Sequence, residues 1–256
     1  MKRILFFLLV TLVAASACSK KVPSEKIIAG FSHYYEKNGD VYREQLVQLA
    51  PEKRNSFILL KLGKDLKAAD VWTLDFEEEN LESGEMEGGQ VIVAEFKSRE
   101  KDRHISLISA CLEDPEACSA VLDVLDAFKE AKFRPAMTLR AVFYEGGTSG
   151  TDGLKAVAHD FFQAGELSTF DIEVSSRDTL PERTFIIEDK LAFAGKIVEV
   201  IPPLIKPVTD VQFEIGDFPR EGWPTNIPTY RYHLSPASAD RLSDLKALTA
   251  FTFLLN

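Results

Sequence analysis

Apolar residues recur along the chain with two different periods, and each change of period predicts where a helix or a strand lies. Helical spacing, with apolar positions three and four residues apart, predicts helices over 24–37, 41–49, 115–132, 154–164, 190–200 and 236–256. Alternating or continuously apolar short runs predict strands over 71–76, 90–96, 104–110, 137–144, 169–175, 184–188, 211–215 and 229–233. An acidic, glycine-containing stretch over 77–89 is expected to link the first two strands.

The order of these elements predicts the fold class. Strands and helices alternate through most of the chain, and the run over 104–110 is apolar enough for a central strand. We therefore expect an α/β fold with a central mixed, mostly parallel sheet and helices on both faces. Neither an internal repeat nor a low-complexity linker divides the chain, so residues 19–256 are expected to form a single domain.

The first eighteen residues have the pattern of a secretion signal. Lys2 and Arg3 precede an apolar run over 4–13, and small residues follow at 14–17. The run is too short to cross a bilayer core, which needs about 20 apolar residues. We expect residues 1–18 to be a signal peptide and the rest to be exported.

A cysteine, Cys18, follows the small residues directly. The sequence Ala-Ser-Ala-Cys over 15–18 resembles a lipobox, where bacterial lipoproteins are cleaved and acylated. Lipidation of Cys18 would anchor the chain to a membrane, in the periplasm or at the cell surface. Cleavage by ordinary signal peptidase, which would leave the protein unanchored, is the alternative.

The net charge argues against one kind of partner, and the cysteine content predicts a disulfide. The net charge of -10 argues against a nucleic-acid partner, because phosphates require a basic surface. With Cys18 lipidated, Cys111 and Cys118 remain as a pair, which an oxidising compartment usually joins. We expect a Cys111–Cys118 disulfide, provided that the geometry of the two residues permits it.

From residue 91 to the C-terminus the chain resembles a known family. The segments that carry it are VIVAEF at 91–96, SLISACLE at 106–113, ACSAVLDVL at 117–125, LRAVFYEG at 139–146, the glycines at 150 and 153, NIPT at 226–229 and YH at 232–233. In texture and order they resemble the di-zinc aminopeptidases, a family that includes secreted leucine-type aminopeptidases and glutaminyl cyclases. This resemblance implies the zinc exopeptidase fold over roughly two thirds of the chain.

The resemblance also implies a site. Two zinc ions in that family share a bridging carboxylate and polarise a water molecule, and a glutamate is the general base. The first histidine ligand falls on Cys111 and the aspartate two residues later on Glu113. The bridging aspartate falls near Asp114, Pro115 or Glu116.

The remaining family positions are only partly retained. The Glu-Glu pair, which supplies the base and a ligand, falls on glycine and threonine at 147–148. The fourth ligand, an aspartate, falls on Glu173, and the last histidine falls on His233. Glu145, two residues before the missing pair, is the candidate replacement base.

Each candidate also has a structural interpretation. Asp114 and Glu116 sit where a helix begins, and carboxylates there stabilise the helix without a metal. Glu173 is a plain strand residue, His233 a histidine at a strand end, and Cys111 a core or disulfide cysteine.

These observations favour an envelope lipoprotein with a catalytically degenerate peptidase fold, which binds a peptide, a protein or an envelope component without a cofactor. The alternative is a metal-dependent aminopeptidase-type hydrolase, in which Glu145 is the base and a single zinc ion is held by some of five residues, Cys111, Asp114, Glu116, Glu173 and His233. A purely structural envelope protein is a third possibility.

Overall fold

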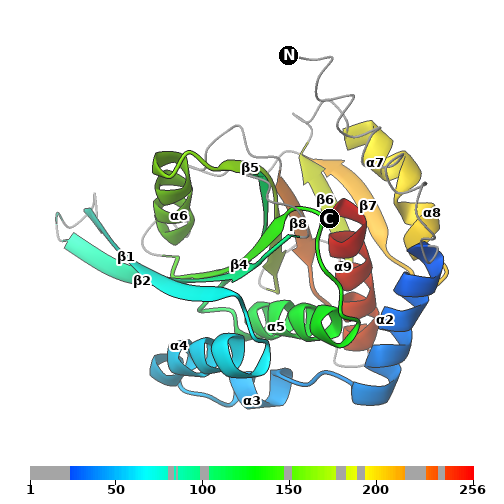
Figure 1. The fold of residues 1–256 in the computed structure, drawn as a ribbon, viewed down its shortest axis with the longest axis horizontal. Coiled ribbons are helices and arrows are strands. Elements are labelled where there is room, and N and C mark those ends of the chain that lie inside the picture. Colours follow the sequence, from blue (N-terminus) through cyan, green and yellow to red (C-terminus); the bar gives the residue numbers. More distant parts are fainter. Residues whose placement is uncertain are drawn as a thin grey trace.

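A mixed eight-stranded sheet forms the centre of the computed structural model (Figure 1). The structure describes residues 24–79, 84, 86–98, 104–146, 152–176, 183–188, 194–216, 229–235 and 240–256. The predicted signal peptide and Cys18 lie outside these residues. Within them, no helix is both long and apolar enough to cross a membrane.

The strand order across the sheet is β1-β2-β4-β3-β5-β8-β6-β7. The strands are β1 (Asp70–Glu79), β2 (Met86–Phe96), β3 (His104–Cys111), β4 (Thr138–Tyr144), β5 (Leu167–Ser175), β6 (Thr184–Glu188), β7 (Gln212–Gly216) and β8 (Thr229–His233). The pairs β4–β3, β3–β5, β5–β8 and β6–β7 are parallel, and β1–β2, β2–β4 and β8–β6 are antiparallel. The predicted mixed sheet with a parallel centre is thus confirmed.

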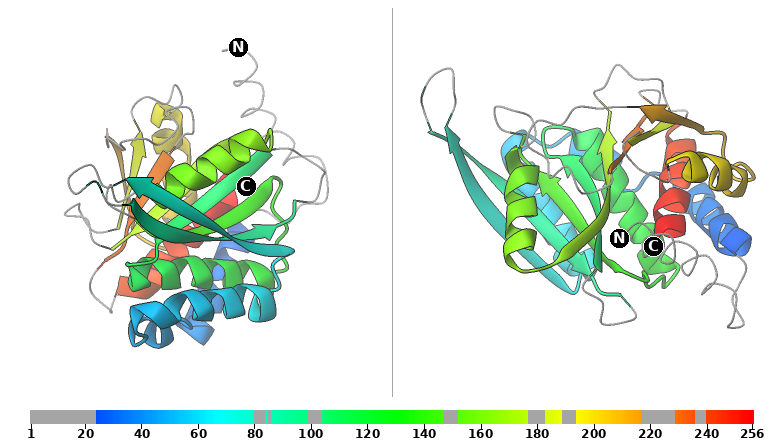
Figure 2. Two further views of the ribbon diagram at one scale, coloured as in Figure 1. Left: turned by 90° about the vertical axis from the view of Figure 1, so that its left-hand side faces the viewer. Right: turned by 90° about the horizontal axis from the view of Figure 1, so that it is seen from above.

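Helices cover both faces of the sheet, also as predicted (Figures 1 and 2). Their bounds are α2 (Ser24–Asn38), α3 (Arg43–Val47), α4 (Pro51–Leu60), α5 (Pro115–Glu130), α6 (Asp152–Gln163), α7 (Ala194–Val200), α8 (Pro202–Ile205) and α9 (Arg241–Leu255), with a π-helical turn, η1, over Lys61–Asp65. The larger hydrophobic core joins α2, α5, α7, α8 and α9 to one face, and α6 closes a smaller core on the other.

Two-residue alternation assigns each strand side chain to one of these faces. In β5, Ile172 and Val174 enter the larger core, whereas Asp171 and Glu173, which alternate with them, project to the opposite face. In β8, Tyr230 and Tyr232 enter the larger core and Arg231 does not. Phe251 of α9 packs on this surface, 4.1 Å from the ring centre of Phe185 and 5.4 Å from that of Tyr230. The polar residues of β5 and β8 therefore share the face that α6 partly covers.

Two predictions about the N-terminal half need correction. Pro51 ends the segment that contains α3, but it is also the first residue of α4, which the sequence analysis missed. Proline is suited to this position because a helix's first N–H groups lack partners in any case. The stretch over 77–89 is not simply a linker, because Glu77 pairs with Gly88 and Glu79 with Met86 in an extended hairpin.

Candidate functional site

The carboxyl ends of four parallel strands lie side by side at one edge of the sheet. Cys111 ends β3 opposite Tyr144, the last residue of β4, and Ser175 of β5 is opposite His233 of β8. Ligand sites in α/β sheets form outside these strand ends. The candidate residues that the sequence analysis singled out belong to these strands or to the segments that directly follow them.

Glu173 is a buried acidic residue at this edge, with only 6% of its surface exposed. The Tyr144 hydroxyl donates a hydrogen bond to Oε1 at 3.0 Å, and Arg231 Nε donates to Oε2 at 2.8 Å. Glu173 and Arg231 are directly opposite each other in β5 and β8, so the ion pair spans adjacent strands on one face. Both carboxylate oxygens thus already have a donor, and one donor is a cation.

The sequence analysis missed Tyr144 and Arg231 as site residues. A signal for Arg231 existed: it alternates with Tyr230 and Tyr232, so a charged side chain was due on the same face as His233. His233 itself is 3% exposed, at the end of β8 between β5 and β6. The structure thus places His233 at the same edge of the sheet as Glu173.

Asp114 is the N-cap of α5 and is 2% exposed. Its Oδ1 accepts hydrogen bonds from the Ala117 amide at 3.0 Å and from the Ser176 hydroxyl at 2.7 Å. Its Oδ2 accepts from the Ser176 amide at 2.7 Å. Capping satisfies an N–H group at the helix start, and here the same carboxylate also fixes the segment after β5. Asp114 therefore joins two strand ends through hydrogen bonds.

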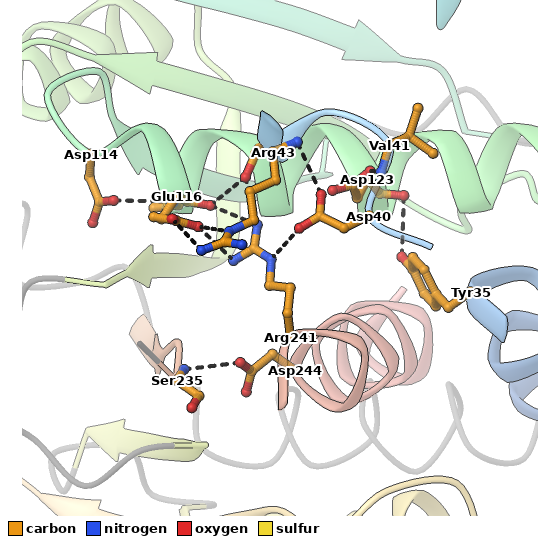
Figure 3. Close-up of polar contacts among 12 residues, drawn as sticks. Tyr35, Asp40, Val41, Arg43, Asp114, Glu116, Asp123, Ser235, Arg241 and Asp244 are labelled. Atoms are coloured by element: carbon orange, nitrogen blue, oxygen red, sulfur yellow. Dashed lines mark hydrogen bonds and ion pairs between the residues drawn. The ribbon is translucent and has the colours of Figure 1, made fainter. Parts of the chain in front are cut away.

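Glu116 faces away from the other candidates. Arg43 binds its carboxylate through Nε at 2.7 Å and Nη2 at 2.9 Å, in the paired geometry of a guanidinium fork. Arg241 Nη1 lies 3.9 Å from the same carboxylate. Figure 3 shows the three side chains together, at the contact of α3, α5 and α9.

No disulfide joins Cys111 to Cys118 in the structure, in contrast to the prediction. The reason is geometric: Cys118 belongs to the larger core, whereas Cys111 packs against the smaller core on the other face. Cys118 Sγ donates to the Cys111 carbonyl at 3.2 Å, and burial raises the pKa of this thiol well above its usual value. Cys111 Sγ instead contacts Glu113 Oε2 at 2.5 Å.

Glu145, the candidate base, is directed toward β2 and α4. Its Oε2 accepts a hydrogen bond from the Gln90 amide at 2.8 Å, and Oε1 accepts from Asn55 Nδ2 at 3.4 Å. The next residue, Gly146, donates its N–H to Glu113 at 3.3 Å. The residues over 147–148, which replace the family's glutamate pair, lie outside the described residues.

Gly153 brings the first turn of α6 against the end of β4. A Cβ atom here would lie 2.7 Å from the Glu145 carbonyl oxygen and 2.9 Å from Tyr144 Cβ, closer than real Cβ atoms approach. The absence of a side chain is thus required for this contact. This contact places α6 beside Tyr144, whose hydroxyl binds Glu173.

A di-zinc centre does not fit the side chains that the structure describes. No three His, Cys, Asp or Glu residues within the described ranges come together as a metal site. The capping bonds of Asp114, the arginines around Glu116 and the Arg231 pair of Glu173 occupy the carboxylates that a metal would need. Catalytic zinc sites use three protein ligands and keep one position open.

Comparison with known proteins supports the fold alone. No family model matches the chain, and no curated protein sequence matches it. Among solved structures it is similar to a glutaminyl cyclase from an Acidobacteriales bacterium (TM-score 0.61, 12% identity, 93% of this chain and 97% of that chain). It is also similar to a Macrostomum lignano glutaminyl cyclase (0.61, 13%, 88% and 92%) and to a Zn-dependent exopeptidase from Parabacteroides distasonis (0.56, 13%, 91% and 97%).

These likenesses confirm the predicted zinc exopeptidase-like fold. They cover nearly the whole chain, more than the two thirds in which the sequence resembles the family. At such low identity the fold carries no statement about activity.

Replacement of Arg231 tests how much its ion pair with Glu173 contributes to the stability of the fold. The pair is largely buried, with 19% of the Arg231 side chain and 7% of the Glu173 side chain exposed. Loss of one partner of a buried pair leaves a charge without compensation, so Arg231→Ala should lower the free energy of unfolding by about 3–5 kcal/mol. Urea denaturation measures this.

Lys196→Ala is the matched control, because the Lys196–Glu199 pair is 67% and 70% exposed and should change stability by less than about 1 kcal/mol. An Arg231→Ala effect no larger than this control would contradict the structural role of the pair.

Proposed function

We propose that this protein is an extracytoplasmic, lipid-anchored domain whose zinc exopeptidase-like fold is catalytically degenerate and acts by binding. The observation that carries the proposal is the Glu173 carboxylate, which pairs with Arg231 and accepts a hydrogen bond from Tyr144. A metal ligand needs a carboxylate oxygen that faces the ion, and an adjacent guanidinium repels a dication. No catalytic step through zinc follows from these contacts.

The loss of the glutamate pair supports the same proposal. The family's general base and one ligand fall on glycine and threonine at 147–148, which have no carboxylate. Glu145 is held toward β2 and α4 by Gln90 and Asn55. The proposed role is to bind a peptide, a partner protein or an envelope component, with the strand ends as the contact region, as in other folds of this type.

The export and anchoring part of the proposal rests on the N-terminal sequence. A charged start, an apolar run and small residues precede Cys18 in the order that a lipoprotein signal requires. Acylation of Cys18 would leave residues 19–23 as a short polar tether before α2. The acidic net charge of -10 agrees with a partner other than nucleic acid.

Zinc stoichiometry tests the degenerate site. Purified protein is saturated with zinc, dialysed and analysed for metal per chain, beside a His233→Ala variant. We expect well below one zinc per chain, with no difference between the two proteins, because Glu173 is already compensated by Arg231. One or two tightly held zinc ions that disappear in His233→Ala would instead establish the hydrolase alternative, and aminoacyl reporter substrates would then be tried.

Metabolic labelling tests the anchor. In cells given a labelled fatty acid, the wild-type chain should become labelled and remain in the membrane fraction, because acyl chains bury methylene groups in the bilayer. Cys18→Ala should lose both properties, and Cys111→Ala is the control that should keep them. Unlabelled wild-type protein, or label that survives Cys18→Ala, would contradict lipidation.

A further inference from the structure

Two carboxyl groups from distant parts of the sequence meet beneath the N-terminal helices (Figure 3). Asp40 lies in the turn between α2 and α3, and Asp123 lies in the middle of α5 with none of its surface exposed. The contact also includes Arg241, from the first turn of α9. Asp40 and Asp123 lie away from the strand ends, and the proposed function does not involve them.

Asp40 is fixed by a backbone donor and a cation. Its Oδ1 accepts from the Arg43 amide at 3.0 Å, and its Oδ2 accepts from Arg241 Nε at 3.0 Å. The Arg241 side chain is 5% exposed. It also donates hydrogen bonds to two uncharged oxygens, the Glu116 carbonyl at 2.9 Å and the Ser119 hydroxyl at 2.6 Å. One guanidinium is thus the nearest compensation for the buried Asp123 and the partly buried Asp40.

Asp123 has one satisfied oxygen and one that is not. Its Oδ1 accepts from the Val41 amide at 3.0 Å. Its Oδ2 is fully buried without a hydrogen-bond donor among the described residues, and the Asp40 side chain lies beside Asp123 (Figure 3). Two carboxylates cannot bond to each other, whereas a carboxylic acid donates to a carboxylate. A proton on Asp123 therefore turns the unsatisfied oxygen into a donor.

Electrostatics at this position favour that proton. Burial, and then the adjacent Asp40 carboxyl, raise the pKa of Asp123 well above its usual value, while Arg241 and the Val41 amide act in the opposite direction. The other titratable or charged groups that surround the pair are Tyr34 and Tyr35 from α2, Tyr42 and Arg43 from the following segment, and Glu116 and Asp126 from α5.

We propose that Asp40 and Asp123 share one proton in the folded protein, and that loss of this proton as the pH rises releases residues 39–43 from α5 and α9. The segment is the connection between α2, which packs on α9, and α3, which packs on α5. The Val41 amide attaches this segment to Asp123 of α5, the Asp40 carboxyl attaches it to Arg241 of α9, and the Arg43 side chain binds Glu116. The first two of these contacts involve the two carboxyls. A second negative charge would have to share the Arg241 guanidinium.

The direction of the pH effect follows from proton linkage. An aspartate whose folded-state pKa is raised binds its proton more tightly when folded, so its stabilising contribution is complete below the unfolded pKa near 4. The contribution decreases as the pH rises toward the folded-state value and is absent above it. In that interval the unfolding equilibrium constant increases by up to about tenfold for each pH unit.

The test compares urea unfolding of the full chain and two variants between pH 5 and pH 9. Asp123→Asn keeps the acceptor for Val41 and gives Asp40 a permanent donor, so it should remove most of the wild-type pH dependence and be the more stable protein at pH 9. Asp126→Asn, one helical turn along α5, is the control and should keep the wild-type dependence. Asp244, whose pKa burial raises to about 6, titrates in all three proteins and cancels in the comparison.

Parallel wild-type and Asp123→Asn profiles would overturn the proposal. A second measurement decides the matter even if a variant fails to fold: carbon-13 NMR of the assigned Asp123 side chain in the wild-type protein. We expect a carboxylic acid signal at pH 5, where an ordinary aspartate is ionised, together with hydrogen exchange at the Val41 amide that speeds up by more than tenfold per pH unit until this signal titrates and by no more than about tenfold per unit above that pH. A carboxylate signal at pH 5 and above would refute the shared proton.

Discussion

A buried carboxylate is stable only when donors or a cation replace the water that it has lost, and at the strand ends this constraint applies to Glu173. Its strand, β5, is in the parallel centre of the sheet, and alternation sends every second side chain away from the larger core. The charge must be compensated on the face that α6 partly covers. Arg231, directly opposite on β8, provides a cation, and Tyr144 provides a hydroxyl.

The other acidic candidates are likewise engaged in holding the fold together. Asp114 caps α5 and binds the segment after β5, while Glu116 ties α5 to α3 and α9 through two arginines. Each of these tasks needs an ionised or hydrogen-bonded carboxylate, which is also what a metal centre needs. The same residue types at the same strand ends thus suit a structural network, and this is the physical basis for the proposed binding role.

The fold was largely accessible from the sequence, because periodicity records which face of each element is buried. The strands of the parallel centre and the helix after β3 were predicted close to their observed bounds. The cap at Asp114 was also foreseeable, since an aspartate before Pro115 is a common helix start. The helix that was not predicted is α4, which begins at Pro51, directly after the segment in which one helix was expected.

The site was less accessible, because its partners are far apart in sequence. Fifty-eight residues separate Glu173 from Arg231, and 73 separate Arg43 from Glu116. No local pattern records such a pairing, which arises only when strand order and helix packing are known. The disulfide prediction failed for a related reason: seven residues of separation said nothing about the opposite faces on which Cys111 and Cys118 lie.

The most direct test of the central claim, that an arginine and not a metal compensates Glu173, is diffraction at the zinc absorption edge from crystals grown with excess zinc. The account predicts Arg231 Nε still bound to Glu173 and no anomalous peak between Glu173 and His233. A peak about 2.0–2.2 Å from a Glu173 oxygen or a His233 nitrogen, with Arg231 turned away, would contradict it.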